Sequence, residues 1–304
     1  MMILFGSAQV LAEGAKVLII CSDQQESTLR SVKGIRQTVE TGRIPVELEV
    51  YIAISGDSAA DAVRTKVTEF SPSVIVTVGS RSTRLAKSLD LKIPIVFSSV
   101  LSPVTSGLVA SYEHPGEFLT GASLDIDVNI QLERFKRLVP KAKRIGVLYS
   151  ERTAYMVEQS LVWASQHSLE MVPFEVKSPK DVPTGVDSLT RSCDGLWAIP
   201  DELIYTPQST RFILLESFRN MIPTMGFSPS FVQSGALFAL VVDHKFVGVQ
   251  AGGLVTKILN GTPASKLSVT TPEAPYLYLN RNTAEKLRLD IPSDYYSVAK
   301  EVYE

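Results

Sequence analysis

Ser80 and Arg81 are the residues of this sequence best suited to hold a charged group of a small molecule. They follow Val74–Val78, an almost continuously apolar run typical of a strand buried in a parallel sheet, and they begin a stretch with helical spacing. The first N–H groups of a helix have no partner within it, and a guanidinium can bind a carboxylate through two hydrogen bonds. We therefore predict a carboxylate site here, with Ser80 as the N-cap of the helix. The alternative is that Arg81 points into solvent.

Two neighbouring acids, Asp201 and Glu202, follow a second apolar run, Gly195–Ile199. Two carboxylates can act as general acid and base only where their surroundings separate their pKa values. Because the sequence gives no sign of such surroundings, we expect these acids, together with Ser150, to hold hydroxyl or ammonium groups, or to lie in a solvated loop. An amino-acid-like or otherwise zwitterionic ligand would suit both sets of residues.

No motif of the common catalytic or cofactor-binding classes occurs in the sequence. GxSxG, GxGxxG, GxxxxGK[ST] and HExxH are all absent. The two cysteines, Cys21 and Cys193, lie far apart and form no CxxC pair, so cysteine-based metal and redox motifs are absent as well. We predict that the protein is not an enzyme and uses no cofactor or metal. Cys21 ends an apolar run, and we expect it to be a buried thiol rather than half of a disulfide.

Composition indicates a globular chain of about two domains. The 304 residues are 45% hydrophobic and 20% charged, with a net charge of −2. A nucleic-acid partner is not expected, because no run of lysine and arginine is long enough to form a basic patch. A membrane span is not expected either, because no segment reaches the roughly 18 apolar residues that a transmembrane helix needs.

The N-terminal residues 1–12, MMILFGSAQVLA, are apolar, rich in small residues and uncharged. They resemble the end of a secretory signal peptide, in which Val10-Leu11-Ala12 would supply the small residues of the cleavage site, although a positively charged start is lacking. We therefore interpret residues 1–15 as a signal-peptide remnant or a disordered arm, with the mature chain beginning near Glu13. The alternative is an apolar arm packed on the first strand.

The candidate residues depend on an alternation of strands and helices that occurs twice. Strand, helix, strand, helix, strand, helix and strand follow one another in residues 16–121, and the same order restarts at Arg144 and continues to residue 227. Within the first half, Ile93–Ser98 is expected to be the strand after Val74–Val78. The pattern predicts an α/β protein of two similar, doubly wound parallel-sheet lobes joined by a hinge.

Ligands of such sheets bind at the carboxyl ends of the strands, and two lobes imply a cleft between them. His244 lies close to the predicted cleft, and contact with the ligand is one interpretation of it. The candidate ligand-binding residues at the expected strand ends are Ser22, Asp23, Ser80, Arg81, Ser98, Ser99, Tyr149, Ser150, Asp201, Glu202, Phe227 and Asp243.

Several segments resemble, in the same order and spacing, a family of bacterial ABC-transporter substrate-binding proteins. They are IPIVFSSVLSPVTSGLV, HPG, LTGAS, KRIGVLYS, DGLWAIPDE, GALFALVVDHKFVGVQAGGLVTKILNG and LYLNRNTAEKLRLDIP. The resemblance covers nearly the whole chain after residue 15. It implies the type I periplasmic-binding-protein fold, and some family members bind aromatic amino acids.

In that fold the chain crosses between the lobes three times, with a helix near residues 246–259 returning to lobe 1. The implied lobes are residues 16–121 with 243–270, and residues 122–242 with 271–304. The glycine-rich segment GVQAGG, residues 248–253, is interpreted as the small-residue side of a close helix contact rather than a phosphate loop.

The resemblance implies a protein outside the cytoplasm, periplasmic in bacteria that have a periplasm. Such a protein captures a small, possibly amino-acid-like ligand in the cleft and delivers it to the permease of an ABC transporter. A ligand-sensing domain that acts on a signalling partner would use the same cleft and is the alternative function. A repressor is disfavoured, because no helix-turn-helix precedes residue 16.

Overall fold

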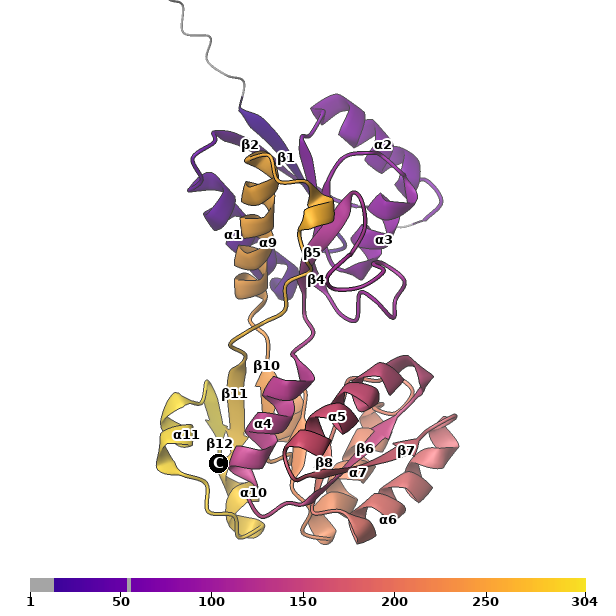
Figure 1. The fold of residues 1–304 in the computed structure, drawn as a ribbon, viewed down its shortest axis with the longest axis vertical. Coiled ribbons are helices and arrows are strands. Elements are labelled where there is room, and N and C mark those ends of the chain that lie inside the picture. Colours follow the sequence, from indigo (N-terminus) through magenta and orange to yellow (C-terminus); the bar gives the residue numbers. More distant parts are fainter. Residues whose placement is uncertain (1–13, 54–55) are drawn as a thin grey trace, which may run out of the picture. The chain divides into compact units, whose positions relative to one another are not determined.

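The computed structural model describes residues 14–53 and 56–304, which form two compact units (Figure 1). Unit 1 contains the described residues up to Asp125 and His244–Thr271, and unit 2 contains Ile126–Asp243 and Pro272–Glu304. The chain therefore passes between the units three times. These boundaries lie slightly later in the chain than the lobe boundaries expected from the sequence, and Asp243 falls in unit 2. Of residues 1–15, interpreted as a signal-peptide remnant or a disordered arm, only Gly14 and Ala15 lie in the described part, and Ala15 is the first residue of β1.

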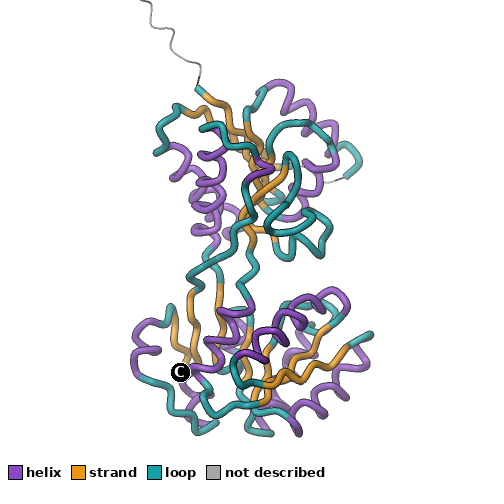
Figure 2. The backbone as a smooth tube through the Cα atoms, in the orientation of Figure 1, coloured by secondary structure: helices purple, strands orange, loops and turns teal. Residues whose placement is uncertain are grey.

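Unit 1 is built on a five-stranded parallel sheet in the order β2-β1-β3-β4-β5. Apolar side chains are buried on both faces, because helices cover each of them (Figure 1). Figure 2 shows the long loop of residues 101–118 between β4 and β5. The elements are β1 (Ala15–Cys21), α1 (Glu26–Glu40), β2 (Val46–Ile52), α2 (Ala59–Phe70), β3 (Val74–Val78), α3 (Ser80–Ser88), β4 (Ile95–Val100), β5 (Leu119–Ser123) and α9 (His244–Leu259).

Unit 2 is built on a seven-stranded sheet in the order β12-β11-β10-β9-β8-β6-β7. Neighbouring strands are parallel except for the pair β10 and β11, which is antiparallel. Its strands are β6 (Arg144–Tyr149), β7 (Glu170–Glu175), β8 (Gly195–Trp197), β9 (Thr224–Gly226), β10 (Phe238–Val241), β11 (Tyr276–Asn280) and β12 (Glu301–Tyr303). Its helices are α4 (Val128–Leu138), α5 (Ala154–Gln166), α6 (Val182–Ser192), α7 (Pro207–Arg219), α8 (Pro229–Gln233), α10 (Arg281–Lys286) and α11 (Ser293–Val298).

The duplicated architecture expected from the sequence is confirmed. The order β2-β1-β3-β4 in unit 1 recurs as β7-β6-β8-β9 in unit 2, and each strand is followed by a helix until the fourth. The strand predicted at Ile93–Ser98 is shifted in the structure to Ile95–Val100. Pro94 has no N–H to donate, so the ladder begins after it, and an irregularity at Ser99 carries the strand beyond Ser98.

Helices α1 and α9 pack directly against each other through glycines (Figure 1). A Cβ atom added to Gly34 would lie 2.1 Å from the carbonyl oxygen of Lys245, and one added to Gly248 would lie 2.1 Å from that of Ser31. The two backbones are therefore in contact where a side chain would normally separate them. This confirms the interpretation of the glycine-rich segment as a close helix contact.

Both cysteines are buried free thiols, as expected for Cys21. Burial, helped by the negative charge of Asp23, raises the pKa of Cys21 to about 12, and burial also raises the pKa of Cys193. Since only the thiolate reacts, we expect neither cysteine of the folded protein to react with a disulfide reagent such as DTNB at pH 8. Both should react at once in guanidinium chloride, and rapid labelling of the native protein would contradict the structure.

Within residues 14–53 and 56–304, no helix has both the length and the hydropathy needed to cross a lipid bilayer.

Candidate functional site

Three neighbouring strands of unit 1 end at a common edge of the sheet, and the residues that follow them form the first half of the candidate site. Strands β1, β3 and β4 are adjacent and parallel, so their carboxyl ends meet. The structure thereby brings together six of the residues predicted from the sequence. They are Ser22 and Asp23 after β1, Ser80 and Arg81 after β3, and Ser98 and Ser99 within β4.

Helix α3 begins differently from the prediction. Ser80 is the first residue of the helix and not its N-cap, because Gly79 takes that position with a φ of 93° that glycine adopts readily. The hydroxyl of Ser22 accepts a hydrogen bond from the N–H of Ser82 at 3.0 Å. One of the N–H groups that an anion could have bound is therefore already satisfied from the neighbouring strand end.

Arg81 extends across the strand ends and binds them. Its guanidinium donates hydrogen bonds to the carbonyl oxygens of Ser22 and, at 3.3 Å, of Ala53, which follows β2. The residue is nevertheless exposed. A guanidinium fixed in this way keeps its positive charge at the carboxyl edge of the sheet, and its contact with a ligand stays a prediction.

Asp23 supplies a negative charge on the same edge. Its carboxylate accepts hydrogen bonds from the Thr28 hydroxyl at 2.6 Å and from the Gln25 N–H at 3.0 Å. These bonds, the one from Thr28 first, lower the pKa of Asp23, and Arg81 adds a smaller effect in the same direction. Asp23 is therefore ionised at neutral pH and could pair with an ammonium group.

Ser98 and Ser99 have different surroundings although they are neighbours. Ser98 is buried, and its hydroxyl lies 2.8 Å from that of Ser31 in α1. Ser99 lies at a β-bulge with a left-handed φ of 58°, and its hydroxyl lies 3.3 Å from Nδ1 of His244. Bulges of this kind redirect a side chain next to a functional site.

The strain at Ser99 can be measured by two substitutions that remove the same hydroxyl. Alanine keeps the unfavourable left-handed conformation, whereas glycine adopts it freely. We expect Ser99→Gly to be more stable than Ser99→Ala by about 1 kcal/mol, the cost of a left-handed conformation for a residue with a Cβ. Urea unfolding of both variants measures this difference. Equal stabilities would show that the bulge is relaxed.

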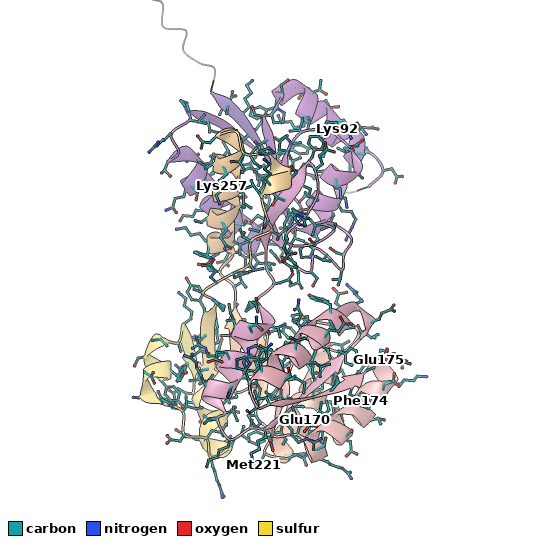
Figure 3. All side chains as sticks on the ribbon, in the orientation of Figure 1. Lys92, Glu170, Phe174, Glu175, Met221 and Lys257 are labelled. Carbon is teal, nitrogen blue, oxygen red and sulfur yellow. The ribbon has the colours of Figure 1, made fainter. Side chains whose placement is uncertain are left out.

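The edge of unit 1 also contains apolar residues that sequence reasoning missed. Leu29 in the first turn of α1, Leu101 directly after β4 and Phe246 in the first turn of α9 have exposed fractions of 54%, 42% and 42%. In the described part of unit 1, no other large hydrophobic residue is so exposed. In unit 2 such residues are scattered, and Met221, for example, projects away from the ribbon (Figure 3). The sequence signal that could have found them is a large apolar residue in the first turn of a helix or directly after a strand end.

Unit 2 places its predicted residues at the carboxyl edge of its own sheet. Tyr149 ends β6 and Ser150 follows it, and Asp201 and Glu202 lie shortly after β8. The buried carboxylate of Asp201 accepts hydrogen bonds from the hydroxyl of Ser150 at 2.5 Å, from that of Thr153 at 2.9 Å and from the Leu203 N–H at 3.0 Å. Asp201 therefore connects two loops of this edge, and much of its bonding capacity is used within the protein.

Glu202 differs from its neighbour. It is exposed, and its carboxylate lies 3.7 Å from the guanidinium of Arg152, which is also exposed, so the pair contributes little to stability in solvent. Asp243, after β10, accepts a hydrogen bond from the hydroxyl of Tyr276 at 3.1 Å. Glu202 is thus the predicted acid of this edge that is most accessible.

Phe227 follows β9 and belongs to an aromatic cluster. Its ring centroid lies 5.3 Å from that of Tyr205 and 4.8 Å from that of Phe231. The cluster lines a groove of about 960 Å³ on unit 2, which also includes residues of α7 and α10 such as Phe218 and Lys286. Contact of Phe227 with a ligand is not tested by this arrangement and stays a prediction.

The two sheets, with polar and charged groups at their carboxyl edges, define an α/β protein of the periplasmic-binding type. Residues 15–303 match the family described as ABC transporter substrate binding protein. The chain belongs to this family of solute-binding proteins, whose members are typically extracytoplasmic.

Known relatives agree with this assignment. A tyrosine-binding protein of Clostridioides difficile is 30% identical over 217 residues, which are 70% of this chain and 62% of the relative, so the match spans about three fifths of that protein. The ligand-free, open structure of a substrate-binding protein with adhesive properties from Clostridium difficile has a TM-score of 0.77 at 23% identity, covering 95% of this chain and 99% of that one.

A third relative is the ABC domain from Streptococcus pneumonia in complex with L-Trp. Its structure has a TM-score of 0.64 at 21% identity and covers 95% of this chain and 99% of that one. The two structural matches show that the fold is shared, and they confirm the two-lobed α/β class predicted from the sequence.

Proposed function

We propose that the protein captures an amino-acid-like ligand with an aromatic side chain, using the carboxyl edges of both sheets, and delivers it to the permease of an ABC transporter. Closure of the two lobes about their crossings would bury the ligand. The protein would act outside the cytoplasm and catalyse no reaction.

The observation that carries this proposal is the combination of groups at the edge of unit 1. Arg81 offers a positive charge for a carboxylate, and Asp23 offers a negative charge for an ammonium group. Leu29, Leu101 and Phe246 provide exposed apolar surface at the start of α1, after β4 and at the start of α9. An amino acid with a large apolar side chain presents the complementary three groups, and an aromatic ring would pack well on Phe246. The tyrosine-binding relative and the L-Trp complex support the same ligand class.

Titration calorimetry with pure compounds tests this ligand class. We expect binding of at least one of L-tyrosine, L-tryptophan and L-phenylalanine, and much weaker binding of L-alanine, which lacks the ring. Tyramine lacks the carboxylate and 3-(4-hydroxyphenyl)propionate lacks the ammonium group, so both should bind more weakly than L-tyrosine by about tenfold or more. Tyramine binding as tightly as L-tyrosine would refute the carboxylate site, and equal binding of the propionate would refute the ammonium site. Binding of no amino acid would refute the ligand class.

Delivery to a transporter needs a separate measurement. A strain in which the gene is deleted should lose high-affinity uptake of the radiolabelled amino acid, and a plasmid copy should restore it. Unchanged uptake, with loss of a transcriptional or motile response to the same amino acid, would favour the ligand-sensing function.

A further inference from the structure

The carboxylate of Asp125 collects hydrogen bonds from three segments of unit 1. The backbone N–H of Ser102 donates to both of its oxygens, at 2.9 Å to Oδ1 and 3.0 Å to Oδ2. The hydroxyl of Tyr112 donates to Oδ2, and so does that of Ser123 at 2.9 Å. Burial raises the pKa of Asp125, and the bonds from these three residues oppose that shift. A partly buried acid with this many neutral donors fixes the positions of the segments that carry them.

The turn that Asp125 holds is a strained one. Ser102 has a left-handed φ of 50°, which is uncommon for a residue with a Cβ atom. It also precedes Pro103, and the residue before a proline favours extended backbone. The conformation of Ser102 therefore needs support from its surroundings, and the carboxylate of Asp125 binds the N–H of this residue.

The start and the middle of the loop of residues 101–118 are held in different ways. Leu108 and Val109 are buried in the core of unit 1, and Nζ of Lys87 donates to the carbonyl oxygens of Gly107 and Leu108 at 2.8 and 2.9 Å. Leu101, the first residue of the loop, is exposed at the carboxyl edge and is not part of that core. Its position depends on the turn at Ser102.

We infer that Asp125 is a positioning residue for ligand binding: by holding Ser102 and Tyr112 it fixes Leu101 at the carboxyl edge of unit 1. The inference rests on the proposed function, because Leu101 belongs to the apolar part of that site. Asp125 is also the last residue of unit 1 before the first crossing of the chain. The same carboxylate therefore joins the ligand edge to the start of that crossing.

Asp125→Asn tests the inference, because it places an amide NH₂ among three donors. We expect the amides of residues 101–112 to exchange with deuterium about tenfold faster or more, and the amino acid that the wild type binds best to bind about tenfold more weakly. The matched control is Asp127→Asn. Asp127 lies on the same segment, is exposed and caps α4 through the N–H of Asn129 at 2.7 Å. Asparagine caps helices equally well, so this control should behave as the wild type.

A rescue experiment separates positioning from general destabilisation. Glycine at position 102 keeps the N–H and adopts the left-handed conformation without strain. The double variant Asp125→Asn with Ser102→Gly should therefore regain most of the lost affinity. Asp125→Asn with Gly253→Ala, which adds stability in α9 of the same unit without touching the loop, should stay as weak as Asp125→Asn alone. Absence of rescue, or wild-type affinity in Asp125→Asn, would overturn the inference.

If Asp125→Asn does not fold, the same measurements can be made on Tyr112→Phe, which changes the structure less. It removes one donor and keeps the ring, and we expect faster exchange of residues 101–112 with weaker binding. If the wild type binds none of the tested amino acids, the proposed ligand class fails. The exchange comparison still tests whether Asp125 fixes the position of residues 101–112. Faster exchange in Asp125→Asn than in Asp127→Asn supports this positioning role of Asp125, and equal exchange overturns it.

Discussion

Gly248→Ala should destabilise the protein by about 1–3 kcal/mol, the range for forcing extra atoms into a packed core. The added Cβ atom would lie 2.1 Å from the backbone carbonyl oxygen of Ser31, far inside contact distance. Neither backbone can move away without separating α9 from α1. Chemical denaturation measures the loss, which should appear in the transition that unfolds unit 1.

Gly253 offers a control within the same helix. A Cβ atom added there meets nothing within 4 Å, so Gly253→Ala should stabilise the protein by about 0.5–1 kcal/mol through higher helix propensity. The two identical substitutions in α9 are thus expected to have opposite signs. A stabilising Gly248→Ala would show that the two helices are not in contact at this position.

Arg81→Ala should weaken binding of the amino acid by about tenfold to a hundredfold. Hydrogen bonds to a charged group contribute about 1.5–3 kcal/mol, and each 1.4 kcal/mol changes Kd tenfold. Arg81→Lys keeps the charge but loses the planar fork of donors, so its affinity should fall between those of the wild type and the alanine variant. Titration calorimetry measures all three Kd values.

The control for Arg81 lies on the next turn of the same helix. Arg84 is also exposed, and Arg84→Ala removes the same side chain from α3. Its Kd should equal that of the wild type. If Arg81→Ala also leaves Kd unchanged, its guanidinium serves only to bind the carbonyl oxygens of Ser22 and Ala53, and the ligand carboxylate is bound elsewhere.

Most of the sheet topology could be predicted, because strands buried on both faces are nearly continuous apolar runs. Val74–Val78 is fully buried and lies where the pattern put it. The exact span of β4 could not be predicted, since its bulge at Ser99 involves His244, which lies 145 residues away in the chain. Strand β12 could not be predicted from periodicity, because its three residues are exposed or half-buried and form no apolar run.

The sequence predicted which residues of the candidate site follow the strand ends, but not how their side chains bind one another. The sequence indicated that Ser22 and Ser80 lie at the carboxyl edge of a sheet, since each follows a predicted strand. It could not indicate that the Ser22 hydroxyl binds the N–H of Ser82, nor that Ser150 and Asp201 bind each other across 51 residues. Such pairings depend on side-chain directions that only the assembled sheet determines. Asp125 was missed for the same reason, because its partners lie up to 23 residues away in a loop without periodicity.

The discontinuous chain of unit 1 has a consequence for synthesis on the ribosome. Helix α9, which packs against α1 and covers β3, β4 and β5, is made only after the whole of Ile126–Asp243 has been translated. Until then α1 covers only part of the sheet face that it shares with α9, and the apolar strands left uncovered are open to chaperones and to other chains. The middle segment of unit 2 emerges earlier but lacks β11 and β12 until Pro272–Glu304 has been translated. Each unit therefore completes its fold only after part of the other unit has been made, so the folding of the two units overlaps in time.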